Sequence, residues 1–172
     1  VSPERTAVLL RALAVLPHGV EAMDTDFPGL VQTSLNMGVV RLDGAGLHVT
    51  FSIRSSIASR KEMLAQRVRA AAALAGGTVT ERGVYPGWQY RRDSQFRETL
   101  LAAYKDLTGK DGVVEATHGG LECGLLMEKL PGLDAVSLGP DLHDIHSVRE
   151  RLDVSSVART YALVCEVLRR SV

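Results

Sequence analysis

Apolar residues recur at helical spacing near the start of the chain, across residues 8–16. Ser2, Pro3 and Glu4 precede this pattern, and they are residue types that open helices: a capping hydroxyl, a proline in the first turn and an early acidic residue. The pattern therefore predicts a helix that begins after Ser2 and ends near Pro17.

The next two apolar stretches alternate with polar residues and predict strands at residues 30–41 and 47–54. An Asp-Gly step at residues 43–44 lies between them and is a strong hairpin signal. Successive side chains of a strand point to opposite sides, so Arg54 is expected to share the polar face of the second strand with His48.

Residues 55–75 carry a longer helical pattern that ends at two glycines, and residues 78–84 form a short β-type run after it. The predicted order is helix, strand, strand, helix, strand. This is the order of a ferredoxin-like βαββαβ sandwich without its first strand. We expect the missing strand upstream of Val1 or from a partner, because a position in the sheet would otherwise remain unpaired.

A turn-rich Tyr-Pro-Gly-Trp segment at residues 85–88 predicts a boundary between two modules, residues 1–84 and 85–172. The second module alternates helices and short strands and is typical of part of a doubly wound sheet. The predicted fold class is therefore α/β, with an α+β first part. The expected helices of the second module are residues 94–107, 121–129 and 154–170, and its expected strands are residues 113–117 and 135–138.

Composition narrows the classes of function. A hydrophobic content of 45% and a formal net charge of +0 describe an ordinary globular protein, without the basic field that nucleic acids or anionic membranes attract. No apolar run approaches the roughly 20 residues of a membrane span, and no signal peptide is evident. Two cysteines without a Cys-x-x-Cys spacing fit a reducing cytoplasm, and the start at Val1 suggests a segment of something longer.

A loop rich in histidine and carboxylate residues follows the predicted strand at 135–138. His143 and His146 stand beside Asp141 and Asp144, before the last helix. Active sites of open α/β sheets gather at the carboxyl ends of strands, so this loop could hold a metal ion. A catalytic zinc usually needs about three protein ligands, which the loop alone does not guarantee. An exposed polar loop without a metal explains the same residues.

A His-Gly-Gly-Leu-Glu-Cys sequence at residues 118–123 is a second candidate. Its glycines allow close backbone approach before a helix whose first N–H groups favour an anion or a carbonyl oxygen. A tight turn, with Glu122 complementing the helix dipole, is the structural alternative.

Two strand residues are further candidates for ligand binding. The Arg54 guanidinium suits a substrate carboxylate, and the Asn36 amide of the neighbouring strand suits a polar ligand group. Each also has a structural explanation, as an exposed sheet arginine and as a cap on a bulge. Gly-x-Ser-x-Gly, P-loop and Gly-x-Gly-x-x-Gly sequences are all absent from the chain, so serine-hydrolase and nucleotide chemistry have no support.

Five blocks of sequence, taken in order, are more informative than any of them alone. They are Thr-Ser-Leu-Asn-Met-Gly-Val-Val at 33–40, Phe-Ser-Ile-Arg-Ser-Ser at 51–56, Tyr-Pro-Gly-Trp at 85–88, His-Gly-Gly-Leu-Glu-Cys-Gly-Leu at 118–125, and Ser-Leu-Gly-Pro at 137–140 leading through His-Ser at 146–147 to Glu-Arg-Leu at 150–152. Together they resemble the C-terminal part of the bacterial Xaa-His dipeptidases, the aminoacyl-histidine dipeptidases of the M20 metallopeptidase clan.

The resemblance implies a two-zinc catalytic domain interrupted by a ferredoxin-like lid that also forms a homodimer. Residues 1–84 would be the latter part of the lid, and residues 85–172 the last part of the catalytic domain. The resemblance implies that His146 is a zinc ligand, Arg54 binds the C-terminal carboxylate of the dipeptide, and Asn36 makes another substrate contact. His118 and Glu122 match a loop that lines the substrate pocket.

Two departures from the family's pattern accompany the resemblance. Residues 148–150 read Val-Arg-Glu, where relatives commonly show a proline and a small acidic or polar residue. The His-x-Asp motif, the bridging aspartate, the Glu-Glu pair with the general base and the remaining aspartate ligand have no counterpart in the chain. We therefore expect a cytoplasmic dipeptidase fragment that is inactive alone. The alternatives are a self-associating lid module and a stand-alone metal or amino-acid binding protein that uses His143, His146 and Glu122.

Overall fold

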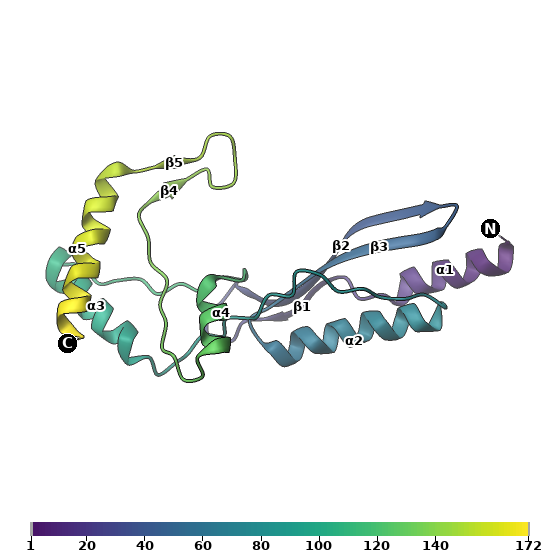
Figure 1. The fold of residues 1–172 in the computed structure, drawn as a ribbon, viewed down its shortest axis with the longest axis horizontal. Coiled ribbons are helices and arrows are strands. Elements are labelled where there is room, and N and C mark those ends of the chain that lie inside the picture. Colours follow the sequence, from purple (N-terminus) through teal and green to yellow (C-terminus); the bar gives the residue numbers. More distant parts are fainter. Residues whose placement is uncertain (1, 172) are drawn as a thin grey trace. The chain divides into compact units, whose positions relative to one another are not determined.

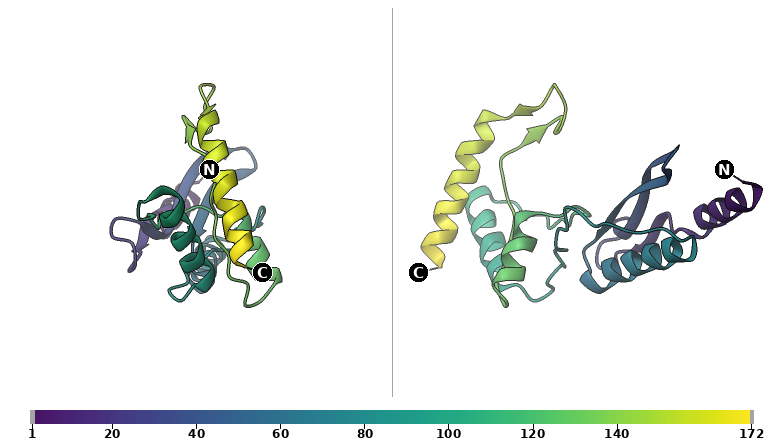
Figure 2. Two further views of the ribbon diagram at one scale, coloured as in Figure 1. Left: turned by 90° about the vertical axis from the view of Figure 1, so that its left-hand side faces the viewer. Right: turned by 45° about the vertical axis from the view of Figure 1, so that its right-hand side comes forward.

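A computed structural model describes residues 2–171 of the chain. The chain divides into two compact units (Figures 1 and 2). The first unit comprises Val1–Tyr90 and Glu115–Glu128, and the second comprises Arg91–Val114 and Lys129–Val172. The predicted boundary after residue 84 falls inside the first unit, and the assignment of the two sides to lid and catalytic domains stays a prediction.

The first unit is built on a three-stranded antiparallel sheet in the order β1-β2-β3. The strands are β1 (Gly19–Met23), β2 (Val31–Asp43) and β3 (Gly46–Ser55), and the helices are α1 (Pro3–Val15), α2 (Ala58–Leu74) and most of α4 (Glu122–Lys129). The predicted helices and the β2–β3 hairpin are confirmed, because caps and turns mark them locally. The Ser2 hydroxyl accepts a hydrogen bond from the Arg5 N–H at 3.3 Å, and Asp43 Oδ1 accepts one from the Ala45 N–H at 2.9 Å.

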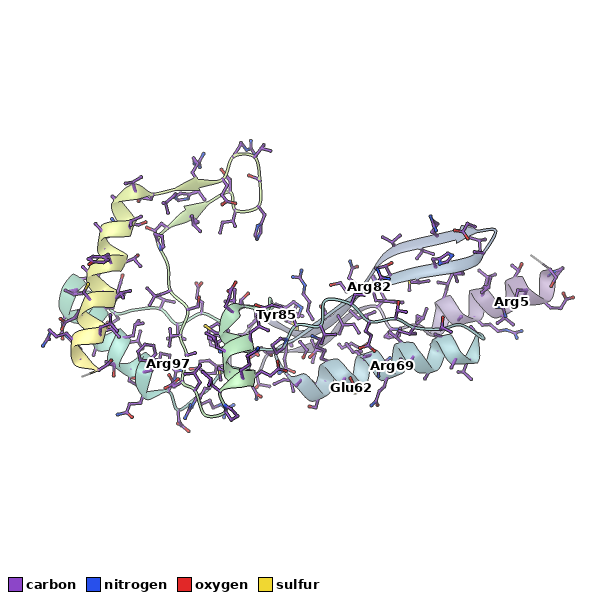
Figure 3. All side chains as sticks on the ribbon, viewed as in Figure 1. Arg5, Glu62, Arg69, Arg82, Tyr85 and Arg97 are labelled. Atoms are coloured by element: carbon purple, nitrogen blue, oxygen red, sulfur yellow. The ribbon has the colours of Figure 1, made fainter. Side chains whose placement is uncertain are left out.

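Two predictions about strands of the first unit are wrong. The sequence did not indicate β1. This strand pairs antiparallel with β2, and the register of the pair shifts at two points. Residues 78–84 were expected to form a strand but lie outside any strand. A strand requires a neighbour for its backbone groups, and this run has no strand partner among residues 2–171. The run is attached to α2 instead through Arg69, which pairs with both Glu62 and Glu81. Figure 3 labels Arg69 and Glu62 on α2.

The core of the first unit lies between the sheet and α2. Leu35 of β2 packs against Leu64 and Val68 of α2, and all three side chains are buried. Leu16, Phe51 and Ile53 surround this cluster. Because strand side chains alternate, one face of the sheet closes the core and the opposite face stays available to solvent or a ligand.

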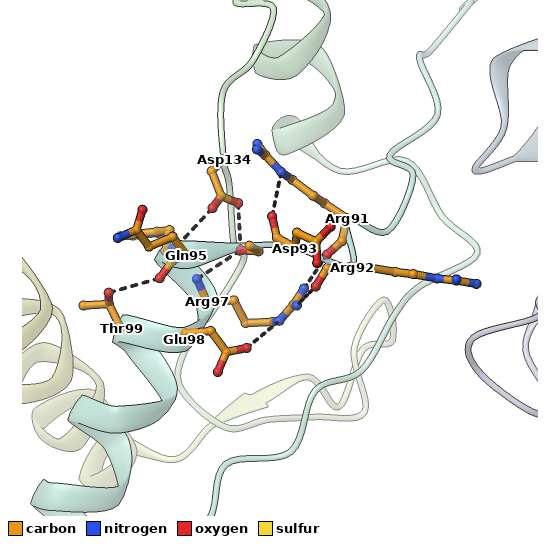
Figure 4. A network of polar contacts seen from close by, with 10 residues as sticks. Arg91, Arg92, Asp93, Gln95, Arg97, Glu98, Thr99 and Asp134 are labelled. Atoms are coloured by element: carbon orange, nitrogen blue, oxygen red, sulfur yellow. Dashed lines mark hydrogen bonds and ion pairs between the residues drawn. The ribbon is translucent and has the colours of Figure 1, made fainter.

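The second unit consists mainly of the helices α3 (Gln95–Thr108) and α5 (Val154–Arg170), which pack together. The short strands β4 (Leu142–His143) and β5 (Arg151–Leu152) form a hairpin that leads into α5. At the start of α3, the Asp134 carboxylate accepts hydrogen bonds from the Ser94 hydroxyl at 2.7 Å and the Phe96 N–H at 3.0 Å (Figure 4). This carboxylate fixes the loop before β4 to the first turn of α3.

The strands expected at residues 113–117 and 135–138 are also absent, and both predictions are wrong. Neither run has a strand neighbour within the described chain, and the Val113 side chain is 84% exposed. The mixed fold class is nevertheless confirmed, because helices and strands share the chain as expected and the first unit has α+β character. None of the helices within residues 2–171 is both long and apolar enough to cross a membrane.

Helix α5 buries one side and exposes a row of apolar residues on another. Ser156 and Val167 are buried, whereas five large apolar residues along another side of the helix are exposed. Their spacing of three and four positions places them in one stripe. Its members are Val154, Val157, Tyr161, Val164 and Leu168.

Replacing Leu64 by alanine should lower the free energy of unfolding by about 2–5 kcal/mol, because the truncation leaves a cavity in the core of the first unit. Leu64 is fully buried (0% exposed), whereas Leu74 at the end of the same helix is 86% exposed. The matched Leu74→Ala control should therefore cost less than about 0.5 kcal/mol. Urea unfolding followed by circular dichroism measures both values, and equal losses would contradict the assigned core.

Candidate functional site

The exposed face of the β2–β3 pair carries three polar side chains close together in the ladder. Ser34 pairs directly with Arg54, and Asn36 pairs with Ser52 two positions along the ladder. Residues two apart in a strand point to the same side, so Ser34, Asn36 and Arg54 share a face. Leu35, between Ser34 and Asn36, and Thr33, before Ser34, are buried. They point to the core side of the sheet. The polar face predicted for Arg54 therefore exists, and it includes Asn36.

His118 reaches this face from a distant part of the sequence. Its Nε2 atom lies 2.8 Å from the Ser34 hydroxyl oxygen, across 84 positions of the chain. Burial lowers the pKa of His118 below its usual value, and the positive charge of Arg54 adds to the shift. The ring is therefore neutral near pH 7, which avoids a second cation beside Arg54.

Close contacts between backbones hold the segment around His118 in the first unit. A Cβ atom at Gly124 would lie 3.3 Å from the carbonyl oxygens of both Pro86 and Gly87, and one at Gly120 would overlap the Tyr85 ring. Gly87 itself passes so near residues 55 and 56 that a Cβ would lie 2.6 Å from the Ser56 carbonyl oxygen. Residues 85–88, predicted as a linker, thus pack between β3 and the start of α4.

Glu122 begins α4 and is exposed. The pKa of Tyr85 is raised, first by burial and then by the negative charge of Glu122. Glu122 therefore lies near Tyr85, in the same sequence motif (residues 118–123) as His118. Its role in substrate binding stays a prediction.

Sequence reasoning missed Ser34. Ser34 lies two residues before Asn36, so the strand pattern places both on the same face. Its contact with His118 depends on tertiary packing, which a local sequence pattern does not indicate. Ser34 is the residue that joins the strand motif to the glycine-rich motif.

The loop that contains His146 belongs to the second unit and closes the β4–β5 hairpin, in which His143 pairs with Arg151. A loop between a strand and a helix was expected, so the hairpin corrects that prediction. His146 and Asp144 both have left-handed backbone conformations, with φ values of 64° and 52°. Such conformations are uncommon for residues other than glycine.

Local hydrogen bonds hold this loop in shape. The His146 N–H donates to Glu150 Oε2 at 2.8 Å, and the Ser147 hydroxyl donates to the Asp144 carbonyl at 2.7 Å. The Asp144 carboxylate also pairs with Arg151 at 3.2 Å. The His146 side chain is left exposed at the tip, and His143 lies in the ladder that supports it.

The donor set for a metal is incomplete among the residues that the structure describes. Within residues 2–171, no group of three or more His, Cys, Asp or Glu side chains converges on a point where a metal ion could be held. His146 can offer one imidazole nitrogen, which is one of the roughly three protein ligands that a catalytic zinc takes. The described residues do not by themselves fit a complete zinc site.

Comparison with known proteins relates the whole arrangement to peptidases. The chain is 34% identical over 160 residues to the cytosol non-specific dipeptidase of Escherichia coli K12, a match that covers 93% of this chain and 33% of that protein. It matches the crystal structure of the aminoacylhistidine dipeptidase from Vibrio alginolyticus with a TM-score of 0.86 and 31% identity, over 98% of this chain and 34% of that one. No protein-family model matches the sequence.

The aminopeptidase PepT of Bacillus cereus shares the fold with a TM-score of 0.69 and 20% identity, over 97% of this chain and 46% of that one. The two dipeptidase matches relate the chain to proteins of the peptidase class. More particularly, the chain is a relative of the bacterial aminoacyl-histidine dipeptidases, which confirms the resemblance read from its motifs. It spans about a third of the length of the two dipeptidases that it matches.

Replacing Gly87 by alanine should destabilise the first unit by about 1–3 kcal/mol, because the new Cβ meets backbone carbonyl groups that cannot rotate away. Gly44 in the β2–β3 turn is the matched control, since a Cβ there meets nothing within 4 Å. Urea unfolding of the two variants gives the comparison. A Gly87→Ala protein as stable as Gly44→Ala would show that residues 85–88 do not pack as described.

Proposed function

We propose that the chain is part of a zinc-dependent dipeptidase and that the exposed face of β2 and β3 binds the C-terminal carboxylate of the dipeptide. The observation that carries this proposal is the placement of Arg54 on that face, directly opposite Ser34 and on the same side as Asn36. The names of the two dipeptidase relatives support the reaction class.

Arg54 has the chemistry that a carboxylate requires. Its planar guanidinium can donate two parallel hydrogen bonds to one carboxylate, and the Asn36 amide can donate another. Arg54 forms no ion pair with another residue of the described chain. The neutral ring of His118 carries no negative charge that would balance the guanidinium. A substrate carboxylate would supply the missing negative charge.

His146 is the proposed zinc ligand of this chain. A zinc ion bound with the remaining ligands would acidify a water molecule for attack on the peptide bond. The hairpin around His146 contributes by holding the histidine backbone in one conformation and leaving the imidazole exposed. The other ligands and the general base would come from the rest of a complete enzyme.

Two features support the proposal that this chain works as part of a larger protein. The stripe of five apolar residues on α5 is exposed, although burial of such side chains is worth roughly 1.5–3 kcal/mol each. Residues 113–117 and 135–138 have the composition of strands but no strand partner within residues 2–171. Additional polypeptide that covers α5 and pairs with these runs would satisfy both features.

Location and assembly are part of the same proposal. The Escherichia coli relative is a cytosolic dipeptidase by name, which supports a cytoplasmic setting. Within the described chain, β3 is paired on one side only, so its other edge can accept a strand. A homodimer formed through the lid part would use such an edge.

The purified chain should not hydrolyse an Xaa-His dipeptide when zinc is added, because residues 2–171 contain no group of side chains that could hold a metal ion. Release of free histidine, measured by chromatography, should equal the rate in buffer, with the full-length Escherichia coli dipeptidase as positive control. Turnover by the chain alone would overturn its assignment as an incomplete part of the enzyme.

Replacing Arg54 by alanine should weaken binding of an Xaa-His dipeptide to this chain by about 10-fold to 100-fold, the loss expected when hydrogen bonds to a charged group are removed. An NMR titration measures the dissociation constants. The matched control is Arg41→Ala, because Arg41 lies on β2 but is already paired with Asp43 at 2.8 Å.

A dipeptide with an amidated C-terminus separates charge recognition from other contacts. It should bind the unmodified chain as weakly as the free dipeptide binds the Arg54→Ala variant. Equal affinity of the unmodified chain and Arg54→Ala for the free dipeptide would exclude Arg54 as the carboxylate site.

A further inference from the structure

The side chain of His18 takes part in the hydrogen bonding of β2. Its Nδ1 atom lies 3.1 Å from the backbone nitrogen of Met37, and the Met37 N–H is the donor of this hydrogen bond. A backbone N–H can only donate, so the accepting Nδ1 carries a lone pair and the proton of the neutral ring is on Nε2. The identity of the donor therefore fixes the direction of the contact.

The residues just before β1 explain why a side chain is needed at this point. β1 begins at Gly19, which pairs with Leu35. Two residues further along the same antiparallel register, Pro17 would stand opposite Met37. Pro17 has no N–H to donate, and Gly19 has a φ of 98°, outside the extended geometry of a strand. The backbone ladder ends here, and the His18 ring supplies the acceptor for the next N–H of β2.

The anchored residue lies at an irregular point of β2. On the β3 side Met37 pairs with Phe51, and the register of the two strands shifts between Met37 and Val39. A bulge of this kind leaves a residue without a regular partner and bends its strand. The hydrogen bond on the opposite edge holds Met37 to the segment before β1 and so restricts this bend.

Asn36 and Gly38 flank the anchored residue, and the Asn36 amide lies over the Gly38 backbone. A Cβ atom at Gly38 would lie 3.5 Å from Asn36 Nδ2, which is ordinary van der Waals contact. Asn36 also shares the polar face of the sheet with Arg54. The place of its amide on that face therefore depends on the course of the backbone through residues 36–38.

We propose that His18 is a positioning residue: by accepting the Met37 N–H, its ring fixes the course of β2 at residues 36–38 and holds the Asn36 amide on the polar face. The consequence for dipeptide affinity rests on the function proposed above. β2 lies between β1 and β3, so His18 acts at the edge of β2 opposite the strand that carries Arg54. His18 would influence the dipeptide through Asn36 without touching it.

The hydrogen bond can be observed directly in the unmodified 172-residue chain labelled with nitrogen-15. An N–H···N hydrogen bond transmits a scalar coupling between its two nitrogens. The Met37 amide nitrogen should therefore couple to Nδ1 of His18 without ligand at about pH 8, where an ordinary histidine is neutral. A His18→Asn variant assigns the ring signals. Absence of this coupling would overturn the proposal.

Three variants test whether the ring nitrogen holds Asn36 in place. His18→Ala removes the acceptor, so hydrogen exchange of the Met37 amide should accelerate about 10-fold and the side-chain amide signals of Asn36 should shift. His18→Asn places a carbonyl oxygen as many bonds from the backbone as Nδ1 and should restore both. His48→Ala removes an exposed ring from β3 and should change neither. Unchanged Asn36 signals in a folded His18→Ala protein would contradict the proposal.

Dipeptide titration tests the functional part separately. His18→Ala should weaken binding of an Xaa-His dipeptide about 3-fold to 10-fold. The same change should have no further effect in a chain that already carries Asn36→Ala, because both then act through one side chain. Independent losses that multiply would exclude the route through Asn36.

The two proposals fail in different ways. If the unmodified chain binds no dipeptide, the carboxylate site is wrong, whereas the ligand-free coupling and the Asn36 signals still decide the role of His18. If His18→Ala does not fold, the coupling in the unmodified chain and the Met37 exchange rate in His18→Asn decide it instead. A Met37 amide that exchanges in His18→Asn as fast as an unbonded amide would then count against the proposal.

Discussion

The antiparallel register between β2 and β3 is the constraint on which the rest of the first unit depends. It places Ser34 opposite Arg54 and assigns Leu35 and Ile53 to the side that α2 covers. A shift by one residue would exchange the two faces and move the arginine into the core. Burial of Leu35 against Leu64 therefore fixes the position of a charged side chain on the opposite face of the sheet.

The sequence predicted best what local chemistry decides. Ser2 caps α1, the Asp-Gly step forms the hairpin turn, and the alternation in β3 correctly put Arg54 on the polar face. The strands expected at 78–84, 113–117 and 135–138 are absent from the structure. A strand is stable only with a neighbour, and local composition does not report whether a neighbour is present. The contact of His118 with Ser34 is hidden for the same reason, since the two motifs are 84 positions apart.

The two groups of candidate residues, one in each unit, are organised differently. Around Arg54 and His118, backbones packed through glycines leave little room for rearrangement. Around His146 the fold relies on short-range hydrogen bonds within one hairpin and on two residues in the left-handed region. The first arrangement depends on tertiary packing, whereas the second is encoded almost entirely within residues 141–153.

The close approaches at Gly87, Gly120 and Gly124 also limit how this sequence can change over evolution. None of the three residues offers a functional group, yet each occupies a point where even a methyl group would press on its neighbours. Selection on these positions acts on volume, while selection on Arg54 and His118 acts on charge and hydrogen bonding. Related proteins could therefore differ in ligand preference through the polar side chains and still require glycine at the same three positions.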